Sequence, residues 1–336
     1  KTLKRDKTVF TIHNLVFQLG RNWWEVPLEK KDYGRRTLPL VTDSDIEYIN
    51  FAKRGILYAD AINTVSEQYR EEIMTKKFGQ DLHRVLLNRK ERLFGIVNGI
   101  DSSAYNPIND PGLYKNFDQD SWHLKKENKK YLQRMFGLAE NENIPLICAT
   151  SRVTFQKGFE LILGVLEYMM QMNVQFIVLG EGDKRYIREL QKKAKTYSKR
   201  MAVIPSHEKN QKYETLVYAG SDLFLLPSHH EPCGLNQLIA MRYGCIPIVR
   251  KVGGLYDTVV NYSPATSTGT GFGFTNFNRF ALFRTVVRAV ENFGHKKEWE
   301  KLVKRAMQQS NSWEIPAKKY VKLFRRVLRM NGKNGR

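Results

Sequence analysis

Short apolar runs alternate with amphipathic stretches over the second half of the chain. Five runs of four or five residues, rich in Val, Ile and Leu, are typical of strands buried on both faces of a parallel sheet. They cover 146–150, 175–179, 201–204, 223–226 and 247–250, and the apolar spacing of helices recurs over 158–172, 184–199, 211–220, 234–243 and 280–293. Such alternation implies right-handed crossovers, so the pattern predicts a Rossmann-like α/β domain with helices on both faces of its sheet.

The amino-terminal part has a sparser version of the same pattern. Ser66 has the position of an N-cap residue ahead of a helix. The predicted strands cover 7–13, 61–65 and 92–97, and the predicted helices cover 44–58 and 67–76. Residues 101–125 are rich in Asp, Asn and Pro and predict an irregular connection, whereas 313–330 predict a basic amphipathic helix.

The chain of 336 residues carries 55 Lys or Arg against 34 Asp or Glu, a formal net charge of +21. Its length suggests two domains of roughly 100–200 residues each. The charge favours anionic partners without choosing among nucleic acids, membranes and phosphorylated small molecules. The basic runs at 125–130, 192–200 and 313–330 lack the interleaved aromatic residues of a base-stacking surface. We therefore expect solvated helix faces there, and no nucleic-acid partner.

Membrane insertion and a disulfide framework are both disfavoured. No apolar run approaches the length of a membrane span, and no amino-terminal stretch has the order of a signal peptide. Cys148, Cys233 and Cys245 are too few for a disulfide framework and lack metal-binding spacing. We expect reduced thiols and no membrane partner, in a cytoplasmic protein, or a stromal one if the source is a plastid.

Ligands of a doubly wound sheet bind beyond the carboxyl ends of its strands, and the residues there are polar, charged or glycine-rich. Arg152 and Lys157 follow the strand 146–150 and precede a helix that opens at Gly158. An Arg fork and a Lys point charge beside a helix N-terminus suit a diphosphate. The alternative is a surface turn with two solvated cations.

Three further positions have both a binding and a structural interpretation. Glu231 follows the strand 223–226 and could accept hydrogen bonds from sugar hydroxyls, or cap the next helix. Gly253 and Gly254 would let backbone amides approach phosphate closely, or merely form a turn. His13 follows the first strand and could donate to a sugar hydroxyl, or be an ordinary buried histidine.

Metal and P-loop chemistry are not indicated. Asp43 and Asp45 form an Asp-x-Asp, but they do not follow a strand and are interpreted as a helix cap. The sequence contains neither a Walker A lysine loop nor a complete Gly-x-Gly-x-x-Gly. We expect cations to stabilise a diphosphate without a metal or other cofactor.

Together these motifs resemble the bacterial glycogen synthase and plant starch synthase family of retaining glucosyltransferases. The matching segments keep one order along almost the whole chain. They are Thr11-Ile-His-Asn-Leu15, Gly55-Ile-Leu-Tyr-Ala-Asp60, Thr64-Val-Ser66, Ile96-Val-Asn-Gly-Ile-Asp101, Ser151-Arg-Val-Thr-Phe-Gln-Lys-Gly158, Glu231-Pro-Cys-Gly-Leu-Asn-Gln-Leu238, Arg242-Tyr-Gly244 and Gly253-Gly-Leu-Tyr-Asp-Thr-Val259.

The resemblance implies a GT-B architecture, in which two Rossmann-like domains face each other across a cleft. The first domain, acceptor-side and incomplete, would cover 1–95. The second, which binds the nucleotide sugar, would cover 96–312. The segment 313–336 would be a helix that crosses back to the first domain, followed by a basic tail.

The resemblance also implies transfer of glucose from ADP-glucose to the non-reducing end of an α-1,4-glucan, with retention of configuration. Arg152, Lys157, Glu231 and His13 would be the catalytic residues. Substrate-binding roles would fall to Asn14, Asn98, Cys233, Gly234, Leu235, Asn236, Gly253 and Gly254.

One expected segment is absent from this sequence. The family's amino-terminal Lys-x-Gly-Gly-Leu loop, which reaches the donor phosphates, has no counterpart, so on the order of 100–150 residues would be missing. We therefore expect little activity from the chain alone. The alternatives are another retaining GT-B enzyme that uses a UDP- or GDP-sugar, and an inactive remnant that binds glucan or a partner.

Overall fold

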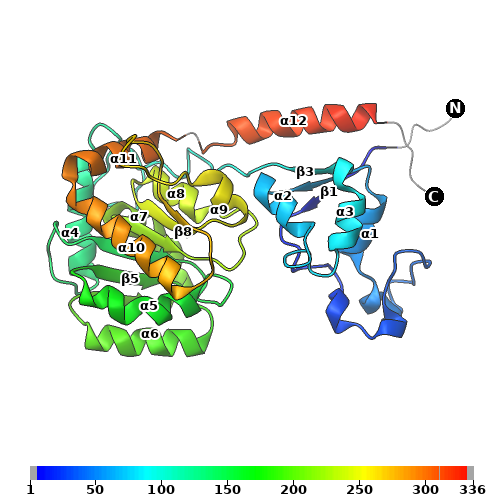
Figure 1. Cartoon of the computed structure of the whole chain (residues 1–336), viewed down its shortest axis with the longest axis horizontal. Coiled ribbons are helices and arrows are strands. Elements are labelled where there is room, and N and C mark those ends of the chain that lie inside the picture. The colour runs from blue at the N-terminus through cyan, green and yellow to red at the C-terminus, as the bar shows by residue number, and fades with distance from the viewer. Residues whose placement is uncertain (1–5, 310, 331–336) are drawn as a thin grey trace. The chain divides into compact units, whose positions relative to one another are not determined.

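The computed structural model describes residues 6–309 and 311–330 and divides the chain into two compact units (Figure 1). Unit 1 comprises residues 1–98 and 314–336, and unit 2 comprises residues 99–313. Each unit is a parallel sheet with helices packed on it, and each is described by itself.

Unit 1 has a three-stranded parallel sheet in the order β1-β2-β3. Its strands are β1 (Val9–Ile12), β2 (Ala61–Thr64) and β3 (Leu93–Gly95), and its helices are α1 (Phe51–Tyr58), α2 (Glu67–Ile73), α3 (His83–Asn88) and α12 (Glu314–Arg329). Ile62 packs with Tyr69 and Ile73 of α2. The neighbouring Ala61 packs with Leu323 and Val327 of α12. Consecutive residues of β2 therefore face different helices, as the alternation of a strand requires.

The amino-terminal predictions are confirmed in part. Ser66 caps α2, since its Oγ accepts the amide hydrogen of Tyr69 at 2.8 Å. Asp43 caps a 3₁₀ turn by accepting from the amide of Asp45. The single helix predicted over 44–58 is wrong, because the 3₁₀ turn ends at Tyr48 and α1 begins only at Phe51, where Asn50 caps it. Helix α3 was not predicted.

Unit 2 has a six-stranded sheet in the order β6-β5-β4-β7-β8-β9, with all neighbours parallel. The strands are β4 (Leu146–Thr150), β5 (Gln175–Leu179), β6 (Met201–Ile204), β7 (Leu223–Leu226), β8 (Ile246–Arg250) and β9 (Phe272–Phe274). The first five were predicted within one residue. The order runs outward from β4 to β6 and then restarts at β7, so the topological switch point lies between β4 and β7.

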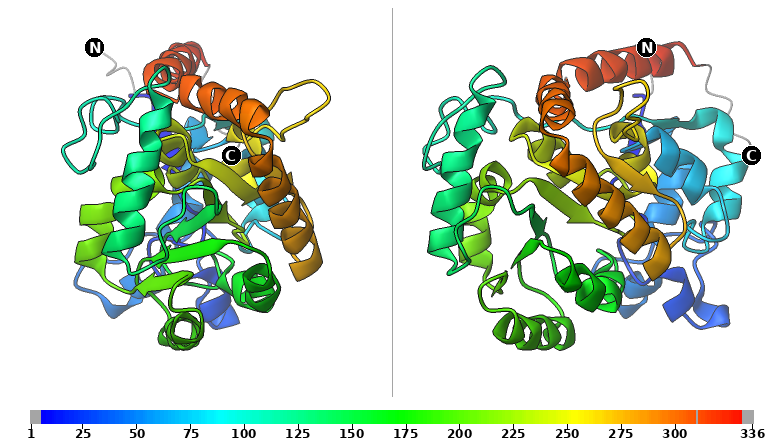
Figure 2. Two further views of the ribbon diagram at one scale, coloured as in Figure 1. Left: turned by 90° about the vertical axis from the view of Figure 1, so that its left-hand side faces the viewer. Right: turned by 60° about the vertical axis from the view of Figure 1, so that its left-hand side comes forward.

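Helices cover both faces of this sheet, as Figure 2 shows. One face carries α4 (Lys125–Met135), α7 (His207–Gly220) and α8 (Asn236–Arg242), with α11 (Lys296–Gln308) packed on α8. The other carries α5 (Phe159–Gln171), α6 (Lys184–Thr196) and α10 (Arg279–Gly294), and the short α9 (Gly253–Thr258) follows β8. The prediction of a Rossmann-like domain is confirmed.

Buried lysines attach α4 to the rest of unit 2. The Lys125 ammonium donates to the carbonyls of Tyr218 and Ala219 at 2.7 Å each, in the last turn of α7. Those carbonyls lack partners within the helix and carry the negative end of its dipole. Burial lowers the pKa of Lys125. The Lys129 ammonium contacts Asp222 Oδ2 at 2.6 Å, and both side chains are largely buried.

Candidate active site

The loops that follow β4 and β7 meet at the switch point of unit 2. Lys157, from the first loop, places its Nζ 2.6 Å from Oε2 of Glu231, from the second. The Ser228 hydroxyl donates to the same carboxylate oxygen at 3.0 Å. Only 17% of the Lys157 side chain and 7% of the Glu231 side chain are exposed. The structure thus brings together a cation and a carboxylate that are 74 residues apart.

A glycine allows these two loops to lie against each other. Gly158 has a φ of +81°, in the left-handed region, and an added Cβ would lie 2.2 Å from the Pro227 carbonyl oxygen. Any side chain would therefore separate the loops. The amide of His229 also donates to the Gln156 carbonyl at 2.8 Å. The position of Lys157 beside Glu231 is fixed by backbone packing as well as by charge.

Burial distinguishes Arg152 from Lys157 and Glu231. Arg152 is exposed, which agrees with a surface turn of solvated cations. Lys157 does not agree with it, because its side chain is largely buried and paired with Glu231. Glu231 does not cap a helix, because α8 begins five residues later and its N-cap is Leu235. Its carboxylate is engaged by Lys157 and Ser228 instead.

The glycine pair packs tightly on the backbone of the Glu231 loop. A Cβ on Gly254 would lie 1.9 Å from the Cys233 carbonyl oxygen, and one on Gly253 would lie 1.9 Å from that of Glu231. The Gly254 amide contacts the carbonyls of Glu231 and Pro232, at 3.1 and 3.2 Å. That amide already has acceptors inside the protein, and a contact of Gly253 or Gly254 with phosphate stays a prediction. Close packing of the two loops accounts for both glycines.

The remaining candidates of this loop have mixed surroundings. Asn236 donates from Nδ2 to the Thr150 carbonyl at 2.8 Å and to Glu214 Oε1 at 3.0 Å, and so joins β4 to α7. Burial raises the pKa of Glu214, which the sequence gave no reason to single out. Cys233 is buried, Gly234 has a φ of +70° and is half-buried, and Leu235 is exposed.

The candidates in unit 1 lie at strand ends. His13 follows β1 and is exposed, so the interpretation as a buried histidine is wrong. Asn14 Oδ1 accepts the amide hydrogen of Val16 at 3.1 Å, which shapes the turn after β1. Asn98 is half-buried near the end of the segment that follows β3.

Three residues of the site were not predicted: Ser228, His230 and Arg250. Ser228 and His230 lie in a loop whose polarity was noted, and Arg250 is a charge that closes an apolar strand. The Arg250 guanidinium is 6% exposed and donates to carbonyls on two other loops. A buried charge at the carboxyl end of a strand is the signal that could have identified it.

His230 provides a pH-dependent prediction. Burial first, and then His229, lower its pKa to about 4, against the opposing effect of Glu231. An unfolded histidine titrates near 6.5, so between these values the unfolded chain binds the extra proton and stability rises with pH. We expect the free energy of unfolding to fall by about 1–2 kcal/mol more between pH 7 and pH 5 in the wild type than in His230→Asn. Urea titrations at the two pH values measure this fall, and His207→Asn, which replaces an exposed histidine, is the control. The same fall in the free energy of unfolding in all three proteins contradicts the prediction.

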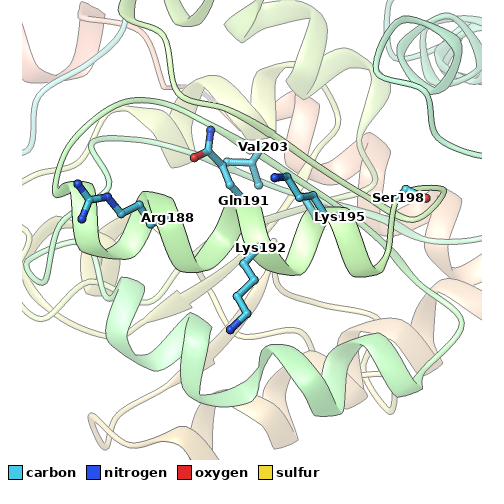
Figure 3. A pocket seen from close by; sticks show the side chains of 7 residues that line it. Arg188, Gln191, Lys192, Lys195, Ser198 and Val203 are labelled. Carbon is cyan, nitrogen blue, oxygen red and sulfur yellow. The ribbon is translucent and has the colours of Figure 1, made fainter.

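Part of the net charge lies on α6, beside a groove that also contacts the edge strand β6 (Figure 3). Arg188, Lys192 and Lys195 line a groove of about 580 Å³ there, together with Gln191, Ala194, Ser198 and Val203. These residues include none of the candidates at the switch point. The charge on α6 is therefore separate from the Lys157–Glu231 site.

Two features are absent from residues 6–309 and 311–330. In that part of the chain, no group of three or more His, Cys, Asp or Glu side chains has the geometry of a metal site. None of its helices is both long and apolar enough to traverse a bilayer. Cys148, Cys233 and Cys245 are all buried free thiols.

Comparison with known proteins gives consistent family matches. Residues 1–88 match the family model described as "Starch synthase catalytic domain", and residues 133–308 match "Glycosyl transferases group 1". The chain is 45% identical over 322 residues to the glycogen synthase of Bacillus anthracis, covering 96% of this chain and 67% of that protein. The glycogen synthase of Clostridium novyi is 42% identical over 326 residues, with 97% and 67% covered.

Solved structures agree with the sequence matches. The catalytic domain of starch synthase IV from Arabidopsis thaliana, bound to ADP and acarbose, has a TM-score of 0.84 and 29% identity, over 96% of this chain and 67% of that one. Sucrose-phosphate synthase from Thermosynechococcus elongatus has a TM-score of 0.60 at 17% identity, over 95% and 67% of the two chains, a likeness of GT-B fold alone. On these matches, the chain belongs to the glycogen synthase and starch synthase family of glycosyltransferases.

Proposed function

We propose that the protein transfers glucose from ADP-glucose to the non-reducing end of an α-1,4-glucan, with retention of configuration. The observation that carries the proposal is the Lys157–Glu231 pair at the switch point of unit 2. It lies where doubly wound sheets bind nucleotides, in a chain 45% identical to a glycogen synthase. The starch synthase structure bound to ADP supports an adenine nucleotide as the donor.

Lys157 and Arg152 act on the leaving diphosphate in this proposal. When the bond between the anomeric carbon and the phosphate oxygen breaks, negative charge builds on the diphosphate. The three ammonium hydrogens of Lys157 allow it to remain on Glu231 while it donates to a phosphate oxygen. The exposed Arg152 is accessible to the same group. Cations that are preorganised where negative charge develops often lower the activation free energy by several kcal/mol. In this proposal Lys157 and Arg152 stabilise the diphosphate without a metal.

Glu231 and the acceptor complete the reaction. A carboxylate fixed by Lys157 and Ser228 can accept hydrogen bonds from the glucosyl hydroxyls and orient the sugar. Attack from the same face forms the new glycosidic bond as the old one breaks, and the acceptor proton passes to the departing phosphate. No enzyme nucleophile is assigned. We propose that His13, Asn14 and Asn98 contact the donor sugar or the acceptor, as the family resemblance implies.

The donor assay tests this function and the nucleotide together. We expect labelled glucose to enter glycogen from ADP-glucose and at least tenfold more slowly from UDP-glucose. The assay compares the 336-residue chain with the same chain joined to the part of the Bacillus anthracis glycogen synthase that it does not match. We expect transfer by at least one of the two proteins. A faster rate from UDP-glucose, or none from either donor in both proteins, contradicts the proposal.

A further inference from the structure

A buried arginine joins three strand ends behind the candidate site. Arg250 closes β8, and its Nη1 contacts the carbonyl oxygens of Ser228 at 3.2 Å and His229 at 2.6 Å. Its Nε donates to the Thr275 carbonyl at 3.0 Å, directly after β9. The guanidinium carbon lies 5.4 Å from the ring centre of Phe277. The loop that carries Glu231 is therefore tied to two neighbouring strands through one side chain.

These contacts continue to the reacting groups without a gap. Arg250 holds the backbone of Ser228, and the Ser228 hydroxyl donates to Glu231 Oε2. The same oxygen receives the Lys157 ammonium. A guanidinium can bind several loop carbonyls more firmly than an ammonium can, because its N–H groups are fixed in one plane. A substitution at Arg250 would thus change the position of the Glu231 carboxylate.

We infer that Arg250 is a positioning residue, which holds the 228–231 loop so that the Glu231 carboxylate is oriented for the sugar of the donor. It acts through Ser228 and Glu231, and it contacts neither the diphosphate nor the sugar. This inference rests on the proposed function. It predicts that Arg250 affects binding of the glucosyl group more than binding of the nucleotide, because its contacts with Ser228 lead to the Glu231 carboxylate.

Equilibrium binding of ADP and ADP-glucose to the 336-residue chain tests this, and transfer activity is not needed. We expect Arg250→Gln to weaken ADP-glucose roughly tenfold, the loss of about one charge-assisted hydrogen bond, and to leave the Kd for ADP within about twofold. In a Glu231→Gln background, Arg250→Gln should have almost no further effect, because its route to the sugar is gone. Arg250→Lys should lie between wild type and Arg250→Gln.

Arg288→Gln is the matched control. Arg288 donates to Asn261 at 2.7 Å, its guanidinium carbon also lies 5.4 Å from a phenylalanine ring, and it does not contact the Glu231 loop. Equal weakening of ADP and ADP-glucose by Arg250→Gln, or the same profile for Arg288→Gln, overturns the inference. If Arg250→Gln does not fold, Arg250→Lys is used instead, and the inference is tested by its effect on the Kd for ADP-glucose relative to its effect on the Kd for ADP. If the wild-type chain binds neither ligand, the same measurement is made on the chain joined to the unmatched part of the Bacillus anthracis relative, and failure of both proteins to bind refutes the proposed function instead.

Discussion

Replacing Lys157 by alanine is expected to lower the rate of glucose transfer from ADP-glucose by about 10²–10³-fold. The variant removes a cation preorganised for the leaving diphosphate. It also leaves Glu231, whose side chain is only 7% exposed, without its ion partner. Both effects reduce the stabilisation of the transition state, and the second also disturbs the carboxylate that would orient the sugar.

The measurement is incorporation of labelled glucose into glycogen, in whichever form of the protein is active. Lys192→Ala is the matched control, because Lys192 is exposed on α6 and lines the separate basic groove. We expect that variant to retain at least half of the wild-type rate. A rate for Lys157→Ala within twofold of Lys192→Ala would remove Lys157 from the diphosphate role.

Lys157→Arg helps to separate the two contributions. An arginine keeps the charge but replaces a compact ammonium by a planar fork on a longer stem. Its fit against Glu231 and Gly158 would be poorer, so we expect an intermediate rate. A fully active Lys157→Arg would show that charge alone is sufficient at this position.

The central strands of unit 2 could be predicted because each is short, apolar and buried on both faces. Strands β4, β5 and β7 are buried at every residue, and a parallel sheet needs no polar face. The edge strand β6 is buried only at Met201, and its apolar composition alone identified it. The strand β9 was not predicted, because it is only three residues long and follows a turn-rich segment. Length, more than composition, distinguishes β9 from the strands that could be predicted.

The solvated helix face expected over 125–130 is wrong, and the buried face of α4 could not be predicted for the opposite reason. Its buried side chains include Lys125, Asn128, Lys129 and Gln133, which a pattern of apolar spacing counts as exposed. The partners of the two lysines include carbonyls at the end of α7 and a carboxylate before β7, and Gln133 pairs with Gln175 of β5. Such partners exist only once the chain has folded, so no local pattern could reveal this face of the helix.

The candidate site also has a part that could be predicted from the sequence and a part that could not. Lys157 and Glu231 could be placed in one crevice, because the carboxyl ends of parallel strands meet at one edge of a sheet. Their direct pairing, the use of the Gly254 amide within the protein and the contacts of Arg250 all depend on distances between loops. Sequence motifs identify residue types at such positions. They do not state which polar groups already have partners.

Replacing Asp222 by alanine is expected to lower the free energy of unfolding of unit 2 by about 3–5 kcal/mol. Asp222 Oδ2 accepts from the Lys129 ammonium at 2.6 Å and from the Leu146 amide at 2.8 Å. Lys129 is 3% exposed and would retain the carbonyls of Glu142 and Ile144 and the face of the Phe293 ring, none of which carries a negative charge. A buried ammonium without its counter-ion is the main cost, and the unpaired amide at the start of β4 adds to it.

Urea unfolding followed by circular dichroism measures this loss. Glu314→Ala is the control, because both side chains of its ion pair with Lys318 on α12 are 70% exposed, and its loss should leave the urea midpoint almost unchanged. The double variant Lys129→Met/Asp222→Leu removes both charges and should recover much of the stability, since apolar pairs of similar volume often replace buried ion pairs without loss. A double variant as unstable as Asp222→Ala would show that the lost hydrogen bond to Leu146, and not the unpaired lysine, is the dominant cost.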